Sequence, residues 1–334
     1  MCYLYVTEHG CVIGCEQNRF EVKKHNQVLT SIPIETLDSI EIHGKSQMTT
    51  QAIEECLSRD IPVSFHSGMG KYLGKLSSSG VTNIYRQKMQ VRRSDDIEFT
   101  LSFTKRIIKA KIHNQLVVLR RYIRNNEKDI HVQMKNIKYV QRKIEKCKSI
   151  EEIMGYEGYA ARNYFSALES LVDEEFAFSG RSRRPPKDEF NTLLSLGYSI
   201  LTHEICAKIE KKGLNACFGI MHSDKSGHYA LASDLIEEWR PVIVDSLVLA
   251  LINGHEIKKE HFTKIPSQEG TYLTYDGKRI FIKKMEKRLH REIEYLEYLA
   301  CPVSFRQALD HQIDQFCKCI ETGNVNEYYP VKIR

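Results

Sequence analysis

Residues 101–123 read LSFTKRIIKAKIHNQLVVLRRYI, and their pattern decides the fold class of this chain. Apolar residues recur every three or four positions, so they form one stripe along a helix, and basic residues surround that stripe. The stripe comprises Leu101, Ile108, Ile112, Leu116, Leu119 and Ile123, and the basic residues are Lys105, Arg106, Lys109, Lys111, Arg120 and Arg121. From about Tyr85 onward the chain is therefore expected to be helical.

Helix signals continue towards the C-terminus. Ser149-Ile150-Glu151-Glu152 is a capping-box signature for a helix through Glu157 to Leu171. Further helices are expected over 129–146, 189–211 (ending at Gly213) and 231–251, where Pro241 must kink or break the last one. We also expect a hairpin of 271–273 with 279–281 around Asp276-Gly277, then two closing helices that end near Glu321.

The chain before this helical part has the signature of short strands. Strands are expected at 4–6, 20–22, 39–42, 61–65 and 72–76, with one helix over 49–56. These patterns predict an α+β protein: a small N-terminal β domain over 1–84, a linker over 85–95 and a larger all-α domain over 96–334. Ser77-Ser78-Ser79-Gly80 is expected to act as a hinge.

Composition sets the class of protein. The 334 residues are 42% hydrophobic and 28% charged, which is typical of a globular protein, and the net charge of +6 suits a polyanionic partner. We find no signal-peptide pattern and no apolar run long enough to cross a bilayer, so a soluble cytoplasmic protein with no membrane partner is expected. The ten cysteines, including the Cys11/Cys15 and Cys317/Cys319 pairs, are interpreted as ordinary thiols, because neither pair has zinc-knuckle spacing.

Three local patterns in the helical part carry candidate chemistry. Glu157 stands among small residues in Gly155-Tyr156-Glu157-Gly158, where another backbone could approach closely and the acid could project into the gap. His222 follows the non-polar run Phe218–Met221 and precedes a polar turn. Asp234 and Glu237 share a helix face, which is unfavourable unless a cation or base lies between them.

Each pattern also has a plain structural reading. Glu157 could be a surface acid, His222 a hydrogen-bonded structural histidine, and Glu237 the ion-pair partner of Arg240. Taken together, however, two carboxylates and one imidazole form a mixed oxygen and nitrogen ligand set suited to Mg²⁺ or Mn²⁺. Such an ion leaves positions open for water or phosphate oxygens, as phosphodiester chemistry requires.

A basic loop lies between these patterns. It reads Ser179-Gly180-Arg181-Ser182-Arg183-Arg184-Pro185-Pro186-Lys187-Asp188. Its arginines could clamp a phosphate backbone, which makes Arg181, Arg183, Arg184 and Lys187 candidate DNA-binding residues; the alternative is a solvated linker.

These motifs resemble, in order and over nearly the whole chain, the CRISPR-associated integrase family, the "Cas one" proteins. The matching stretches are Ser39–Gly44, Ile61–Phe65, Gly155–Gly158 with Ala161 and Tyr164-Phe165, Arg183–Asp188, Asn191–Ser195, Gly197-Tyr198, Gly219–His222 and Asp234–Pro241.

The resemblance implies a homodimer that assembles with the partner protein "Cas two" and inserts short foreign DNA fragments into a repeat array. It also implies that Glu157, His222 and Glu237 are the metal ligands and catalytic residues. Asp234 becomes a neighbouring acid of undecided role, and Lys225 matches a position that contacts DNA. In this reading a 3′-hydroxyl attacks a phosphodiester of the repeat, and His222 acts as a ligand rather than as a base.

Two other functions remain open at this point. One is a metal-dependent nuclease that acts on single-stranded or branched DNA with the same ligand set. The other is a non-catalytic DNA-binding scaffold that uses the basic residues between Lys105 and Lys146.

Overall fold

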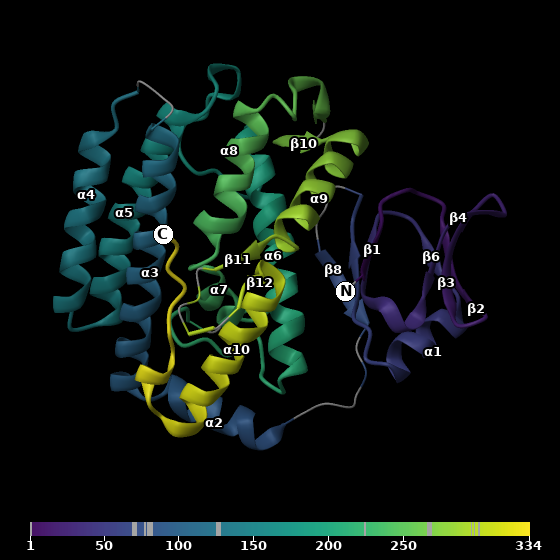
Figure 1. Cartoon of the computed structure of the whole chain (residues 1–334), viewed down its shortest axis with the longest axis horizontal. Helices are drawn as coiled ribbons and strands as arrows, with labels where there is room; N and C mark the ends of the chain where they lie inside the picture. Colours follow the sequence, from purple (N-terminus) through teal and green to yellow (C-terminus); the bar gives the residue numbers. More distant parts are fainter. Residues whose placement is uncertain are drawn as a thin grey trace. The chain divides into compact units, whose positions relative to one another are not determined.

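The computed structural model describes residues 2–68, 72–76, 78, 83–124, 128–223, 225–265, 269–294, 296, 298–299 and 301–334. The chain divides into two compact units, Met1–Val81 and Thr82–Arg334. The first unit is a β unit and the second is mainly helical, which confirms the expected fold class (Figure 1). Ser77, Ser79 and Gly80 of the expected hinge lie outside the described residues.

In its described residues, the β unit contains two four-stranded sheets and one helix. One sheet has the order β1-β5-β7-β8 and the other the order β4-β3-β2-β6. The elements are β1 (Cys2–Val6), β2 (Val12–Glu16), β3 (Arg19–Lys24), β4 (Gln27–Pro33), β5 (Leu37–His43), β6 (Gln47–Met48), α1 (Thr50–Ser58), β7 (Val63–His66) and β8 (Tyr72–Leu76). Strand alternation explains the core, because Ile40 and Ile42 of β5 join the apolar cluster while Glu41 and His43 take the opposite face.

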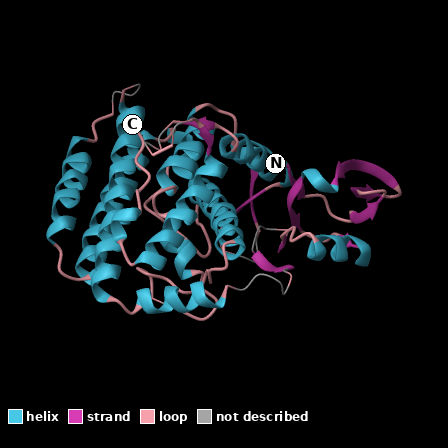
Figure 2. Ribbon diagram, turned by 60° about the horizontal axis from the view of Figure 1, so that its bottom comes forward, coloured by secondary structure: helices cyan, strands magenta, loops and turns pink. Residues whose placement is uncertain are grey.

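The second unit is built from helices with two short strand pairs (Figure 2). The helices are α2 (Ile84–Ser94), α3 (Ile97–Ile123), α4 (His131–Lys143), α5 (Ile150–Leu171), α6 (Glu189–Lys211), α7 (Ala230–Ile236), α8 (Ser246–Asn253), α9 (Tyr275–Leu289) and α10 (Phe305–Thr322). The strand pairs are β9 (Phe262–Lys264) with β10 (Thr271–Leu273), and β11 (Glu292–Ile293) with β12 (Val303–Ser304). No helix in the described residues is long and apolar enough to cross a membrane.

Helix α3 is the centre of one helical layer. It packs against α4 and α5, and the three helices lie side by side in Figure 1. Most of its apolar stripe is buried, as the sequence pattern predicts. Lys111 is also buried on α3, although the pattern placed it among the surrounding basic residues.

Two local expectations were wrong. Residues 85–95 were expected to be a linker, but nearly all of them belong to α2, which Asn83 caps by accepting a hydrogen bond from the Arg86 amide. The expected hairpin around Asp276-Gly277 is also absent, because β10 pairs with β9 and 275–289 form α9. Thr274 caps α9 by accepting a bond from the Gly277 amide, so the Asp-Gly pair starts a helix rather than a turn.

The expected break at Pro241 is confirmed. Helix α7 ends at Ile236, a π-helical segment covers Arg240–Asp245, and α8 begins at Ser246. Pro241 cannot donate a backbone hydrogen bond, which favours irregular geometry at this point. Glu237 and Glu238 therefore lie where the helix changes its pitch.

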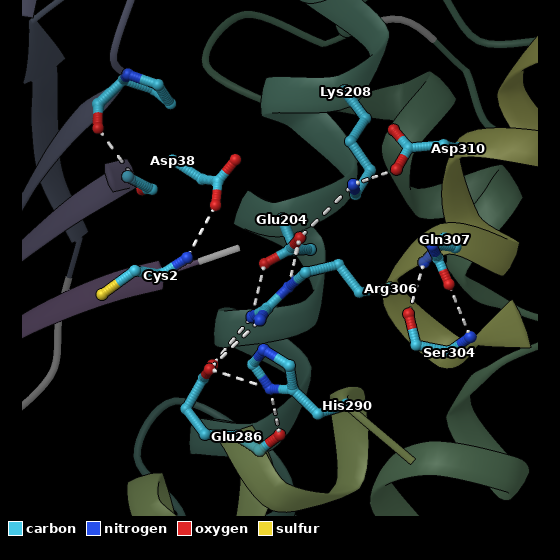
Figure 3. A network of polar contacts seen from close by, with 12 residues as sticks. Cys2, Asp38, Glu204, Lys208, Glu286, His290, Ser304, Arg306, Gln307 and Asp310 are labelled. Atoms are coloured by element: carbon cyan, nitrogen blue, oxygen red, sulfur yellow. Dashed lines mark hydrogen bonds and ion pairs between the residues drawn. The ribbon is translucent and has the colours of Figure 1, made fainter. Parts of the chain in front are cut away.

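A buried arginine joins three helices of this unit (Figure 3). Arg306 of α10 is fully buried and donates to Glu204 of α6 at 3.0 Å and to Glu286 of α9 at 2.8 Å. Such a pair of carboxylates compensates a buried guanidinium, whose fork suits two partners. The contacts fix α6, which carries residues beside the site described below.

The C-terminal segment packs back onto the helical unit. The Val331 and Ile333 side chains are buried, and the segment runs beside α3 in Figure 1. Asn114 of α3 donates to the carbonyl of Val331 at 2.9 Å and accepts from the Ile333 amide at 3.0 Å. The Val331 amide also donates to Glu238 at 2.8 Å, so the segment contacts the helix break that follows Glu237.

Candidate metal centre

Glu157 lies near the middle of α5. Ser149 caps this helix as predicted, and its hydroxyl accepts from the Glu152 amide. The close backbone approach expected around Glu157 is absent, because a Cβ at Gly155 or Gly158 would meet no described atom within 4 Å. The small residues therefore leave open space on this side of α5, while the Glu157 side chain itself is only 15% exposed.

Lys111 connects Glu157 to Glu237. Its ammonium lies 2.5 Å from Oε1 of Glu157 and 2.5 Å from Oε2 of Glu237. Burial would lower the pKa of Lys111, but the charges of the two carboxylates outweigh burial and raise it. Three elements distant in sequence thus meet at one cation, and two of the three expected ligands belong to this group.

Glu237 has a second cationic neighbour. The guanidinium of Arg240 lies 2.8 Å from Oε1 of Glu237, so the ion pair considered as a plain structural reading is present. Burial would raise the pKa of Glu237, but Arg240 and Lys111 overcome it and lower the pKa to about 2. Glu237 is therefore an ionised, buried carboxylate, which is the form that binds a metal ion.

His222 is held by Asp234. Nδ1 of His222 lies 2.6 Å from Oδ1 of Asp234, and because an ionised carboxylate only accepts, this nitrogen carries the proton. Burial would lower the pKa of His222, but the hydrogen bond and charge of Asp234 raise it. Nε2 is left as the ring nitrogen that can bind an ion, an arrangement common among metal-bound histidines.

Asp234 also organises the backbone around His222. Its two oxygens accept from the amides of Ile220 at 2.6 Å, Met221 at 3.0 Å and His222 at 3.0 Å. The side chain is fully buried in α7. Asp234 therefore orients the imidazole rather than facing the cation position between Glu157 and Glu237.

The donor set fits a hard divalent cation. Two carboxylates and an imidazole suit Mg²⁺ or Mn²⁺, and the position of the Lys111 ammonium marks a point that favours positive charge. The ligand atoms of Glu157, His222 and Glu237 do not all lie within 4.8 Å of one another, however. Within the described ranges, three possible ligand atoms lie within 4.8 Å of one another only at Glu41, His43 and His66.

A second polar network involves the π-helical segment that follows Glu237. Asp245 accepts from the hydroxyls of Tyr198 at 2.5 Å and Tyr164 at 3.0 Å. Burial raises the pKa of Asp245 to about 6 against the effect of these donors. The guanidiniums of Arg240 and Arg181 lie over the Tyr198 ring, 4.9 Å and 5.4 Å from its centre. This network links α5 and α6 to the π-helical segment that follows Glu237.

The candidate DNA-binding residues fall into two groups. Arg181 is bound internally, since it donates to Asn191 at 2.8 Å and to Ser195 at 3.1 Å. Its geometry favours a role in holding the loop to α6 over a role in binding DNA. The remaining four are exposed: Arg183, Arg184, Lys187 and Lys225.

Sequence reasoning missed Lys111 as a residue of the site. A signal was available, because Lys111 lies three residues after Ile108 and four before Gln115, on a face that is buried throughout. A lysine at such a position needs a buried acid as a partner. The sequence could not indicate that two acids, from α5 and from the end of α7, would meet it.

Comparison with known proteins places this chain in a family. The family model described as "CRISPR associated protein Cas1" matches residues 4–287. A protein of Mycobacterium tuberculosis (strain ATCC 25618 / H37Rv) named CRISPR-associated endonuclease Cas1 is 36% identical over 333 residues, covering 100% of this chain and 98% of the relative.

Two solved structures agree with this match. A Cas1 protein from Thermotoga maritima superposes with a TM-score of 0.82 at 25% identity, covering 96% of this chain and 97% of its own. A chain of a Cas6-RT-Cas1–Cas2 complex superposes with a TM-score of 0.87 at 27% identity. That likeness covers 100% of this chain but only 36% of the longer chain. This chain therefore belongs to the Cas1 family of CRISPR-associated endonucleases.

Proposed function

We propose that this protein is a metal-dependent DNA endonuclease and integrase that inserts short DNA fragments into a CRISPR repeat array. One observation carries the proposal: carboxylates from α5 and from the end of α7 converge on a single cationic position. Glu157, Glu237 and Nε2 of His222 would hold one Mg²⁺ or Mn²⁺ ion there. Membership of the Cas1 family supports this assignment.

The reaction exchanges one phosphodiester for another. The 3′-oxygen of the incoming fragment forms a bond to phosphorus as the bond from phosphorus to the departing 3′-oxygen of the repeat breaks, so no ATP is needed. When bound, the metal ion supplies Lewis acidity and neutralises charge that develops on the phosphate.

The residues of the chain have separate tasks in this scheme. Asp234 keeps a proton on Nδ1 of His222, so that Nε2 serves as a ligand and does not collect the proton of the attacking hydroxyl. Arg240 stays paired with Glu237 and keeps that carboxylate ionised. With an ion held by the two carboxylates, the Lys111 ammonium would be released from them and could pair with a phosphate oxygen.

The partners follow from the relatives. One similar chain belongs to a complex that contains Cas2. By analogy, we propose that this protein forms a homodimer and assembles with a Cas2 partner on the incoming DNA and the repeat. We assign contact with the DNA backbone to four exposed residues: Arg183, Arg184, Lys187 and Lys225.

A nuclease is the second candidate. The same ligand set with water as the nucleophile would cleave single-stranded or branched DNA. The two functions separate when a labelled fragment with a free 3′-hydroxyl and a repeat-bearing plasmid are incubated with the protein, its Cas2 partner and Mn²⁺. Joined product indicates the integrase, and cleavage without joining indicates the nuclease.

The ligand assignment is tested with Glu157→Gln. We expect strand joining to fall more than about 100-fold and Mn²⁺ binding, followed by electron paramagnetic resonance, to be lost. Glu169→Gln changes an exposed acid on the same helix and is the matched control. If Glu157→Gln joins DNA as well as the control, the proposed site is wrong.

A further inference from the structure

A second group of possible metal ligands lies in the β unit. Glu41 and His43 belong to β5, and His66 belongs to β7. These strands are parallel neighbours in which His43 pairs with His66 and Glu41 with Ser64. Because residues two apart share a face of a strand, the three side chains emerge on one face, where both strands end.

The ligand atoms of this group converge. Oε2 of Glu41 lies 3.3 Å from Nε2 of His43 and 3.8 Å from Nε2 of His66. The three donor atoms all lie within 4.8 Å of one another. Glu41 is 6% exposed, His43 1% and His66 2%, so the group is removed from solvent.

The separations suit a tetrahedral ion. Ligands at about 2.0–2.1 Å from zinc lie roughly 3.3 Å apart in a tetrahedral site. The Glu41–His43 separation already has this value, and the Glu41–His66 separation exceeds it by about half an ångström. The two imidazole rings are stacked side by side, with their centres 4.5 Å apart.

We propose that Glu41, His43 and His66 form a structural site for a divalent transition-metal ion, with zinc as the ion that fits best. Two imidazoles and one carboxylate favour zinc over Mg²⁺, which prefers oxygen ligands. The hydroxyl of Ser64 is hydrogen-bonded to Nε2 of His66 at 3.0 Å, and an ion bound by this nitrogen would replace that contact.

The site would stabilise the sheet rather than take part in DNA chemistry. An ion bound by β5 and β7 ties together two parallel strands that no short hairpin connects. Its ligands belong to Met1–Val81, whereas Glu157, His222 and Glu237 belong to the other unit. Binding at the two sites can therefore be measured separately, and failure of one assignment leaves the other intact.

The test uses the full chain with the proposed catalytic site removed by Glu157→Gln and His222→Ala. We expect this protein to bind about one equivalent of Co²⁺ and to show the intense visible absorption of tetrahedral cobalt, which Zn²⁺ abolishes by displacement. Adding His66→Gln or His43→Gln should remove the absorption. Adding His25→Asn should preserve it, because His25 is an exposed histidine of the same unit at a positive φ that asparagine tolerates.

Two results would overturn the proposal. One is the absence of tetrahedral cobalt absorption in the protein that lacks only Glu157 and His222, and this result does not depend on how the β-unit variants fold. The other is absorption that persists after His43→Gln and His66→Gln. Zinc should also raise the unfolding temperature of the protein that carries Glu157→Gln and His222→Ala, but not that of the same protein with a folded His66→Gln substitution.

Discussion

The ammonium of Lys111 lies 2.5 Å from the carboxylate of Glu157, at the point where the proposed ion would bind. Glu237 contacts the same ammonium, so the lysine balances both acids when no ion is bound. A divalent ion at the proposed site would have to displace Lys111, so metal binding there would be a competition between two cations. This competition can be measured without any DNA.

Lys111→Met should destabilise the metal-free protein and increase its affinity for Mn²⁺. Loss of the ammonium removes the cation that Glu157 and Glu237 share and leaves Glu237 with Arg240 alone, which should lower the free energy of unfolding by about 3–5 kcal/mol in the presence of a chelator. Mn²⁺ should bind roughly tenfold or more tightly, since its competitor is gone, and should restore stability. Chemical denaturation and calorimetric titration measure the two effects.

Lys109→Met is the matched control for this prediction. Lys109 lies on the same helix but pairs with Glu145 at the surface, where an ion pair contributes little. Equal losses of stability in the two variants would contradict the role assigned to Lys111. So would unchanged Mn²⁺ affinity in Lys111→Met.

Asp234→Asn should reduce Mn²⁺ affinity by about 10- to 100-fold, because the amide cannot hold His222 in the same tautomer. The effect must act through His222. In a His222→Ala background, Asp234→Asn should therefore cause little further loss of affinity, and a double-mutant cycle measures this coupling. Equal losses in both backgrounds would show that Asp234 acts independently of the imidazole.

Removing Arg183 and Arg184 together should weaken DNA binding at all sequences and lower its dependence on salt. Each phosphate contact contributes about 0.9 to the slope of log affinity against log salt, so the slope should fall by roughly one to two. Fluorescence anisotropy at several salt concentrations measures this slope.

The control variant combines Lys135→Ala and Lys138→Ala, both on the exposed face of α4. A lower slope in the control alone would place DNA on the basic α3–α4 surface instead, as the scaffold hypothesis requires.

Asp245 should make stability depend on pH. Burial raises its pKa from 3.8 to about 6 in the folded chain. The fold therefore favours the protonated form of Asp245. The resulting stabilisation of the folded state, about 3 kcal/mol, is present below pH 3.8 and is lost as the pH rises through about 6. Asp245→Asn should flatten the unfolding free energy between pH 4 and 6, whereas Asp95→Asn, at an exposed acid, should not. An unaltered profile in Asp245→Asn would contradict this assignment.

Local signals in the sequence predicted most of the helices. Ser149 caps α5, and Gly213, with a φ of +74°, follows the end of α6. Both depend on a few neighbouring residues, so a single sequence contains them. Helix α9 could have been predicted from neighbouring residues. Phe281, Met285 and Leu289 recur at the helical spacing and are buried, and this signal outweighs the turn pattern of Asp276-Gly277.

Contacts between distant segments could not be predicted in this way. Strand β4 was missed because its residues lack a buried face, and Val28 and Leu29 are exposed. The resemblance to the family identified Glu157, His222 and Glu237 as a set, but it did not indicate that Lys111 lies between the two acids. Lys111 and Glu157 are 46 residues apart in the sequence, and their contact depends on how three helices pack.

The C-terminal segment has a practical consequence for protein engineering. The family model stops at residue 287, which suggests a natural place to shorten the chain. Yet Tyr328 and Val331 donate to Glu238, the residue next to Glu237. A shortened protein would leave the Glu238 carboxylate buried without these two donors, one residue from the proposed ligand. A shortened protein should therefore retain Tyr328 and Val331 together with the helices that surround Glu238.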